Sequence, residues 1–183
     1  MKGIVFTEFL EMVEEKFSPE TLDRIIKEAA LPNDGAYTAV GTYDHREMVR
    51  LVSSLSAATQ VPVPDLLRVF GQHLFTRFAQ GYPEFFRDPT GAFQFLLGIE
   101  SRIHTEVRKL YPDAELPRFD CHTPDREHLV MEYQSARAFG DLAEGLILGC
   151  IAHFGEPIDL HRQNLPGEPG THVRFTLARR SGQ

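Results

Sequence analysis

The sequence predicts an α+β protein in which a helical N-terminal half is followed by a small antiparallel sheet with one inserted helix. Up to about residue 110 the apolar residues recur at helical spacing, and beyond it they alternate as in strands. A further helical run at 138–154 interrupts the alternating part, and turn residues at 166–170 separate its last two stretches. The length of 183 residues fits one domain over 1–183.

Two helices and a turn are expected first. Residues 2–16 carry apolar side chains at helical spacing with acids between them, which predicts an amphipathic helix. Ser18-Pro19 supplies an N-cap hydroxyl and a first-turn proline for a second helix, which ends near Ala30. Asn33-Asp34-Gly35 has the composition of a turn.

Acidic residues mark the starts of the next two helices. Asp44, with Glu47 three residues later, forms a variant of the capping box and opens a third helix. Asp65 is expected to cap a fourth helix, which ends before Pro83.

A long helix is expected from about residue 90 to residue 110. His104 lies at the edge of its apolar stripe, so the imidazole can face the core. This position fits a satisfied structural histidine or a surface one as well as a ligand. The stripe consists of Leu96, Ile99, Ile103, Val107 and Leu110.

The second half of the chain should contain strands and one helix. Alternation predicts strands at 116–119, 128–133, 158–164 and 171–178, with a helix at 138–154 that Gly155 ends. The last two strands form a hairpin around the turn that is rich in glycine and proline. Residues 179–183 are expected to be a frayed tail.

Tyr133, Ser135 and Arg137 form the first candidate site. In an extended segment they point to one face and span roughly 13 Å at about 3.3 Å per residue. Such a fork suits a ligand with two carboxylates on a flat apolar body, because the arginine binds one carboxylate bidentately and the hydroxyls donate to the other oxygens. Heme has this form. The solvated face of an ordinary edge strand can also carry three such polar residues.

Composition excludes several classes of protein. The formal net charge of -7 and the pI near 5.6, with no run of Lys or Arg, argue against a nucleic-acid partner. No apolar run approaches the ~20 residues that a membrane span needs. Two cysteines are too few for a disulfide framework. The sequence therefore favours a cytoplasmic protein that binds neither nucleic acid nor a membrane.

A heme-independent thiol or zinc redox sensor on the same fold is the alternative function. It would use Cys121, His122, Cys150, His153 or His161, but the sequence has no Cys-x-x-Cys, and these residues come from three separate segments. An enzyme is not expected, because the sequence has no Gly-x-Ser-x-Gly elbow, His-Glu-x-x-His helix or phosphate loop.

A set of motifs resembles a known family. Met1-Lys2-Gly3, His104 late in the long helix, Pro117 thirteen residues on and Tyr133-x-Ser135-x-Arg137 match, in order and spacing, the heme-nitric oxide/oxygen binding (H-NOX) family. The chain resembles the stand-alone bacterial type, which is similar to the sensor domain of the soluble guanylate cyclase β subunit. The resemblance covers nearly the full length.

By this resemblance, the protein would bind heme b (iron protoporphyrin IX) between its two halves. His104 would be the axial ligand of a five-coordinate ferrous iron. Pro117 would press on the porphyrin and distort it, and Tyr133, Ser135 and Arg137 would hold the two propionates. A single histidine ligand leaves the opposite coordination position open for a gas.

The resemblance also locates a gas pocket. Oxygen-binding members place a tyrosine on the inserted helix, whereas the matching residue here is Leu142. A ferrous-oxygen complex gains from a hydrogen bond to its outer atom, whereas bound NO depends on one much less. We therefore expect a protein that binds NO, and also CO, but forms no stable oxygen complex. The apolar wall expected around the gas consists of Val5, Phe9, Leu74, Phe78, Leu142 and Leu146.

The expected output is a change in a partner protein. The chain carries no kinase, cyclase or DNA-binding segment of its own, and the resemblance implies a histidine kinase or a cyclic-di-GMP enzyme as the partner. Nitric oxide is expected to weaken or break the bond between His104 and iron, and so to shift the helical half relative to the sheet half.

Overall fold

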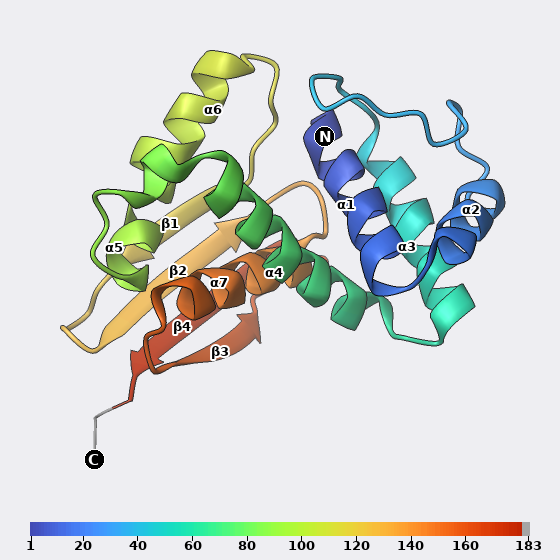
Figure 1. Cartoon of the computed structure of the whole chain (residues 1–183). Coiled ribbons are helices and arrows are strands. Elements are labelled where there is room, and N and C mark those ends of the chain that lie inside the picture. The colour runs from blue at the N-terminus through green and yellow to red at the C-terminus, as the bar shows by residue number, and fades with distance from the viewer. Residues whose placement is uncertain (181–183) are drawn as a thin grey trace.

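The computed structural model describes residues 1–180 and confirms the α+β fold class (Figure 1). A helical half comes first, and α7 is inserted between β2 and β3, as the sequence predicts. The helical segments are α1 (Gly3–Lys16), α2 (Pro19–Glu28), α3 (His45–Thr59), α4 (Val63–Gly81), the 3-10 turn η1 (Pro83–Phe86), α5 (Ala92–Leu97), the π-helical η2 (Ile99–Ile103), α6 (His104–Leu110) and α7 (Gly140–Phe154). The strands are β1 (Arg118–His122), β2 (His128–Gln134), β3 (Ile158–Asn164) and β4 (His172–Arg179).

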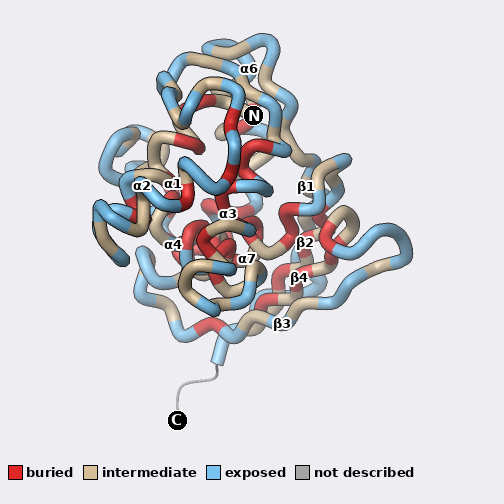
Figure 2. The backbone as a smooth tube through the Cα atoms, turned by 90° about the vertical axis from the view of Figure 1, so that its right-hand side faces the viewer, coloured by how far each residue is buried: buried red, intermediate tan, exposed pale blue. Residues whose placement is uncertain are grey.

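The strands form one antiparallel sheet in the order β1-β2-β4-β3. Side chains from α5 and α7 cover one face of it, so this sheet has a buried side and a solvated side. Figure 2 shows that the buried stretches of the chain gather around α4, α7 and the central strands. The buried cross-strand pairs are Leu129 with Leu177, Met131 with Phe175, and Tyr133 with Val173.

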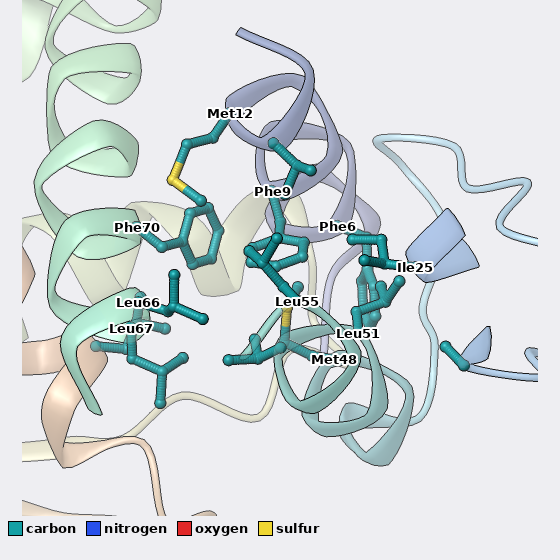
Figure 3. Packing of buried hydrophobic residues seen from close by; sticks show 14 of the residues in the cluster. Phe6, Phe9, Met12, Ile25, Met48, Leu51, Leu55, Leu66, Leu67 and Phe70 are labelled. Carbon is teal, nitrogen blue, oxygen red and sulfur yellow. The ribbon is translucent and has the colours of Figure 1, made fainter. Parts of the chain in front are cut away.

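A second buried cluster lies among α1, α2, α3 and α4 (Figure 3). One face of α1 carries Phe6, Phe9 and Met12, which are fully buried because they recur every third residue. The ring of Phe9 meets that of Phe70 from α4 edge-on, with centroids 5.1 Å apart. Such an aromatic pair adds about 0.5–1.5 kcal/mol to the free energy of unfolding beyond its buried area.

Glycines allow α4 and α7 to pack with their backbones in close contact. A Cβ added to Gly71 would lie 2.4 Å from the carbonyl oxygen of Leu142, and one added to Gly145 would lie 2.2 Å from that of Arg68. A Cβ added to Gly149 would lie 2.7 Å from the Cβ of Phe75. Larger residues at these positions would force the two helices apart.

The helix starts are partly as predicted. Asp44 caps α3, and its side chain accepts a backbone N–H at 2.9 Å. The predicted cap at Asp65 is wrong, because α4 already begins at Val63 and Asp65 lies in its first turn, paired with Arg68. Pro64 explains the earlier start, since its fixed φ suits the first turn of a helix.

The helix predicted from residue 90 to residue 110 is divided. α5 ends at Leu97, and the π-helical segment η2 (Ile99–Ile103) separates it from α6. In the wider turn, the N–H of Ile103 donates to the carbonyl of Gly98, five residues back, at 3.4 Å. The extra residue in this turn changes the direction in which the side chains of α6 point. As a result Leu110, which was predicted to be buried, is 64% exposed.

Some strand limits also differ from the predictions. β1 begins at Arg118 rather than at residue 116, and β2 ends at Gln134. Of the tail expected at 179–183, Arg179 ends β4, and the N–H of Arg180 donates to the carbonyl of Pro157 at 2.8 Å. The rest of that tail lies outside the described residues. Within residues 1–180, no helix combines the length and the apolar character that crossing a membrane requires.

Gly145→Ala should lower the free energy of unfolding by about 1–3 kcal/mol, because the new methyl group meets the backbone of α4. Gly81→Ala is the matched control: among residues 1–180, no atom lies within 4 Å of its added Cβ, and alanine favours a helix more than glycine does. Urea denaturation of both variants measures the difference. Equal stability of the two would contradict close backbone packing at this crossing.

Candidate functional site

A cavity of about 690 Å³ lies between the helical half and the sheet half. Its walls come from α1, α4, the stretch from α5 to α6, the loop before β1, the end of β2, and α7. A cavity in this range suits a small-molecule ligand or cofactor. Most of the lining side chains are aliphatic or aromatic, and the polar ones come mainly from residues 1–2, 42–45, 113–115 and 135–137.

His104 is the buried imidazole of the cavity. It is the first residue of α6 and is 8% exposed. Its Nδ1 lies 2.9 Å from Oε1 of Glu100, one turn earlier. With Nδ1 donating to that carboxylate, Nε2 carries the lone pair. Burial lowers the pKa of His104, although the carboxylate of Glu100 opposes this shift.

Tyr133, Ser135 and Arg137 all line the cavity, but not as alternate residues of one strand. β2 ends at Gln134, so the segment is not extended as far as Arg137 and the three residues do not share one strand face. A turn brings the three residues together instead: the N–H of Arg137 donates to Oγ of Ser135 at 3.1 Å, and the phenol of Tyr133 donates to the carbonyl of Arg137 at 3.4 Å. Burial raises the pKa of Tyr133, so its hydroxyl remains a donor.

The rim beside Arg137 carries charges of both signs, because Lys2 and Arg137 lie there together with Asp44, Asp113 and Glu115. The Arg137 side chain is 15% exposed and pairs with the carboxylate of Glu115, which is 80% exposed. Burial lowers the pKa of His45, and the charge of Arg137 lowers it further. Within this rim, the guanidinium of Arg137 is the group suited to an anionic partner.

The apolar side chains predicted to surround a gas are nearly all in the cavity. Val5 comes from α1, and the other lining residues of this set come from α4 and α7. Phe9 is the exception: it is fully buried in the N-terminal cluster and does not line the cavity. Pro117 also lines it. The members of the predicted set that do line it are Val5, Leu74, Phe78, Leu142 and Leu146.

Several lining residues were not predicted from the sequence. Tyr43 and His45 lie around the start of α3, where no periodicity marks them, and Tyr82 follows the end of α4. Glu100 does not line the cavity but holds His104, and it is the most informative omission, because its spacing of four residues from His104 places the two side chains on one helix face. That spacing was available in the sequence.

The residues of the alternative thiol or zinc site do not converge. Burial raises the pKa of Cys121 to about 12 and that of Cys150 further still, so both remain thiols at neutral pH. His122, His153 and His161 are exposed. Over residues 1–180, no group of three or more His, Cys, Asp or Glu side chains is placed to hold a metal ion.

The donor set fits heme. A largely apolar cavity contains the buried imidazole of His104, whose Nδ1 is already bound, and a guanidinium at its rim pairs with a carboxylate. Imidazole nitrogen is an ordinary iron ligand, and arginine suits a propionate. Fold and cavity together are those of a heme-pocket sensor domain. Residues 2–162 match the family model described as Haem-NO-binding, and the chain belongs to this family of heme-binding gas sensors, H-NOX.

Solved structures support the assignment. An H-NOX protein from K. algicida, as the unliganded Fe(II) A71G mutant, is 40% identical with a TM-score of 0.93, and the match covers 99% of this chain and 97% of that one. The H-NOX from Shewanella woodyi, bound to IWP-051 in the Fe(II)CO state, is 41% identical with a TM-score of 0.82, covering 98% and 95%. An S. oneidensis H-NOX protein in the Fe(II)NO state is 25% identical with a TM-score of 0.90, covering 99% and 100%.

The thiols should be unreactive in the folded protein. Because their pKa values are raised, iodoacetamide at pH 8 should label neither Cys121 nor Cys150 during a time that labels both in urea. Mass spectrometry of the intact protein counts the added groups. Rapid labelling of the folded protein, or zinc that remains after dialysis, would support the thiol sensor instead.

Proposed function

We propose that this protein senses nitric oxide through a five-coordinate ferrous heme b and passes the signal to a partner protein. The observation that carries the proposal is the buried imidazole of His104, whose Nδ1 is fixed by Glu100 within an apolar cavity. Nε2 of His104 is the group available to bind iron. Heme supplies the iron at which a gas binds, and the protein supplies ligation, orientation and exclusion of water.

Tyr133, Ser135 and Arg137 are the residues that we propose for the propionates. Arg137 already pairs with a carboxylate, that of Glu115, and the Glu115 side chain is 80% exposed. Exchange of this partner for a propionate leaves Glu115 in water, where losing an exposed pair costs little. The guanidinium then keeps an anionic partner in a site that is 15% exposed, where a lone charge would be costly.

The gas selectivity that we propose follows from the apolar part of the lining. Leu142 stands at the position where a hydrogen-bond donor is expected in oxygen-binding relatives, and Leu74 and Phe78 line the same cavity. None of these side chains can donate a hydrogen bond. These apolar side chains therefore support binding of NO and CO without a stable oxygen complex.

The output requires a partner that distinguishes two conformations of this protein. A histidine kinase or a cyclic-di-GMP enzyme is the partner that we propose, on family likeness. Pro117 lines the cavity and directly precedes β1, so pressure on the porphyrin at this residue acts on the edge of the sheet. A tenfold change in partner affinity requires about 1.4 kcal/mol of coupling between the two sites.

Arg137→Ala should weaken heme binding by about 2–5 kcal/mol, because a propionate charge loses its partner. Transfer of heme to excess apomyoglobin, followed in the visible spectrum, measures the loss. Arg174→Ala is the matched control, since Arg174 pairs with Glu132 and does not line the cavity. If heme leaves Arg137→Ala, Tyr133→Ala and their double mutant no faster than the wild type, the proposed propionate site is refuted.

The reduced protein should bind NO and CO but form no stable oxygen complex in air. Visible spectra before and after each gas test this. Leu142→Tyr adds a donor, but Leu74 and Phe78 offer no hydrogen bond to orient it, so only a short-lived oxygen complex is expected. Leu142→Phe, which adds a ring without a hydroxyl, is its control. A stable oxygen complex in the wild type would overturn the selectivity and point to Tyr43 or Tyr82 as donors.

A further inference from the structure

Glu100 links the proposed iron ligand to the sheet. Its Oε1 lies 2.9 Å from Nδ1 of His104 and accepts the N–H of Phe119, the second residue of β1, also at 2.9 Å. We propose that Glu100 is the positioning residue that sets the strength of the bond between His104 and iron. This inference rests on the proposed function, since it concerns the same site.

The helix is shaped to hold this contact. Glu100 lies in η2, where the turn is wider than in an α-helix, and Oγ1 of Thr105 donates to its carbonyl at 3.1 Å, five residues on. π-Helical turns often occur at functional sites because they redirect one side chain. Here the turn places a carboxylate beneath the imidazole that begins α6.

The carboxylate is held in place from several sides. The N–H of Phe119 shares Oε1 with the imidazole, and Nη2 of Arg108 lies 3.6 Å from Oε2. The Glu100 side chain is 32% exposed, so most of its surface is enclosed. With two partners at Oε1 and one at Oε2, the carboxylate has little freedom to turn away from His104.

A carboxylate acts on a metal-bound histidine differently from a carbonyl. As a charged acceptor it makes a stronger hydrogen bond with Nδ1–H, which fixes the tautomer and makes Nε2 a more basic ligand. Glu100 therefore strengthens the protein's bond to iron and raises the free energy needed to release the imidazole. Loss of its charge should make release by NO easier.

The test compares Glu100→Gln with Glu106→Gln in the heme-loaded protein. Glutamine keeps the shape and an oxygen acceptor but removes the charge. Glu106 is the control because it lies two residues beyond His104, pairs with Lys109 and does not line the cavity. Resonance Raman of the ferrous protein reports the iron–histidine stretch, and heme transfer reports affinity.

Glu100→Gln should shift the iron–histidine stretch to lower frequency, weaken ferrous heme binding by about 10- to 100-fold, and raise the five-coordinate fraction of the NO complex. Glu106→Gln should change none of these. A wild-type stretching frequency in a folded Glu100→Gln protein overturns the inference.

A second arm separates this inference from the proposed function. His104→Gly should lose the iron–histidine stretch and regain it with added imidazole. If His104→Gly keeps the wild-type band, the axial ligand lies elsewhere and the proposed ligation itself is wrong. If only Glu100→Gln behaves as wild type, the ligation stands and Glu100 has no part in its strength.

Discussion

The close contact of α4 with α7 is the constraint on which the rest of the structure depends. Gly71 and Gly145 leave no side chain between the two backbones, so each helix contributes to both buried clusters. α4 places Phe70 in the N-terminal cluster and Phe75 in the sheet cluster. From this crossing, α1 to α3 and the stretch from α5 to α6 extend in different directions (Figure 1), and the cavity lies between α1 and that stretch. The space for a cofactor therefore results from the directions in which the helices leave the crossing of α4 and α7.

The imidazole and the guanidinium of the cavity are each held by a carboxylate. Glu100 holds the imidazole of His104 and also binds the backbone of β1, while Glu115 pairs with Arg137 across more than twenty residues of sequence. Buried polar groups without such partners would be costly. These partners also fix the direction of each donor before a ligand arrives, which lowers the ordering that binding requires. The chemistry of the site thus comes from contacts between segments rather than from any single motif.

Periodicity and turn chemistry were sufficient for the fold class, the inserted helix and the terminal hairpin, because each depends on local spacing. They failed where a neighbouring residue changed the local geometry: Pro64 moved the start of α4, and the π-helical turn after Gly98 divided the long helix. The resemblance assigned roles to His104 and to the residues around Arg137, which spacing alone left open, and all of these residues line one cavity. It misplaced Phe9, because a residue's distance from a cavity depends on tertiary packing. Glu100 was missed, although its four-residue separation from His104 is the spacing that brings side chains together on a helix.

The two sides of the cavity differ in the kind of contact that they offer. Under the proposed ligation, the directional bonds to heme come from His104 and Arg137, which are tied to β1 and to the end of β2. Val5 and Leu74 offer only van der Waals contact, which has no fixed direction. Across the rim, the amino group of Lys2, whose side chain is 13% exposed, lies 3.5 Å from Asp113, and the hydroxyl of Thr42 donates to the same carboxylate at 2.8 Å. Under the proposed ligation, heme would be held mainly by the segments tied to β1 and to the end of β2, and α1 and α4 would contact it only through apolar side chains.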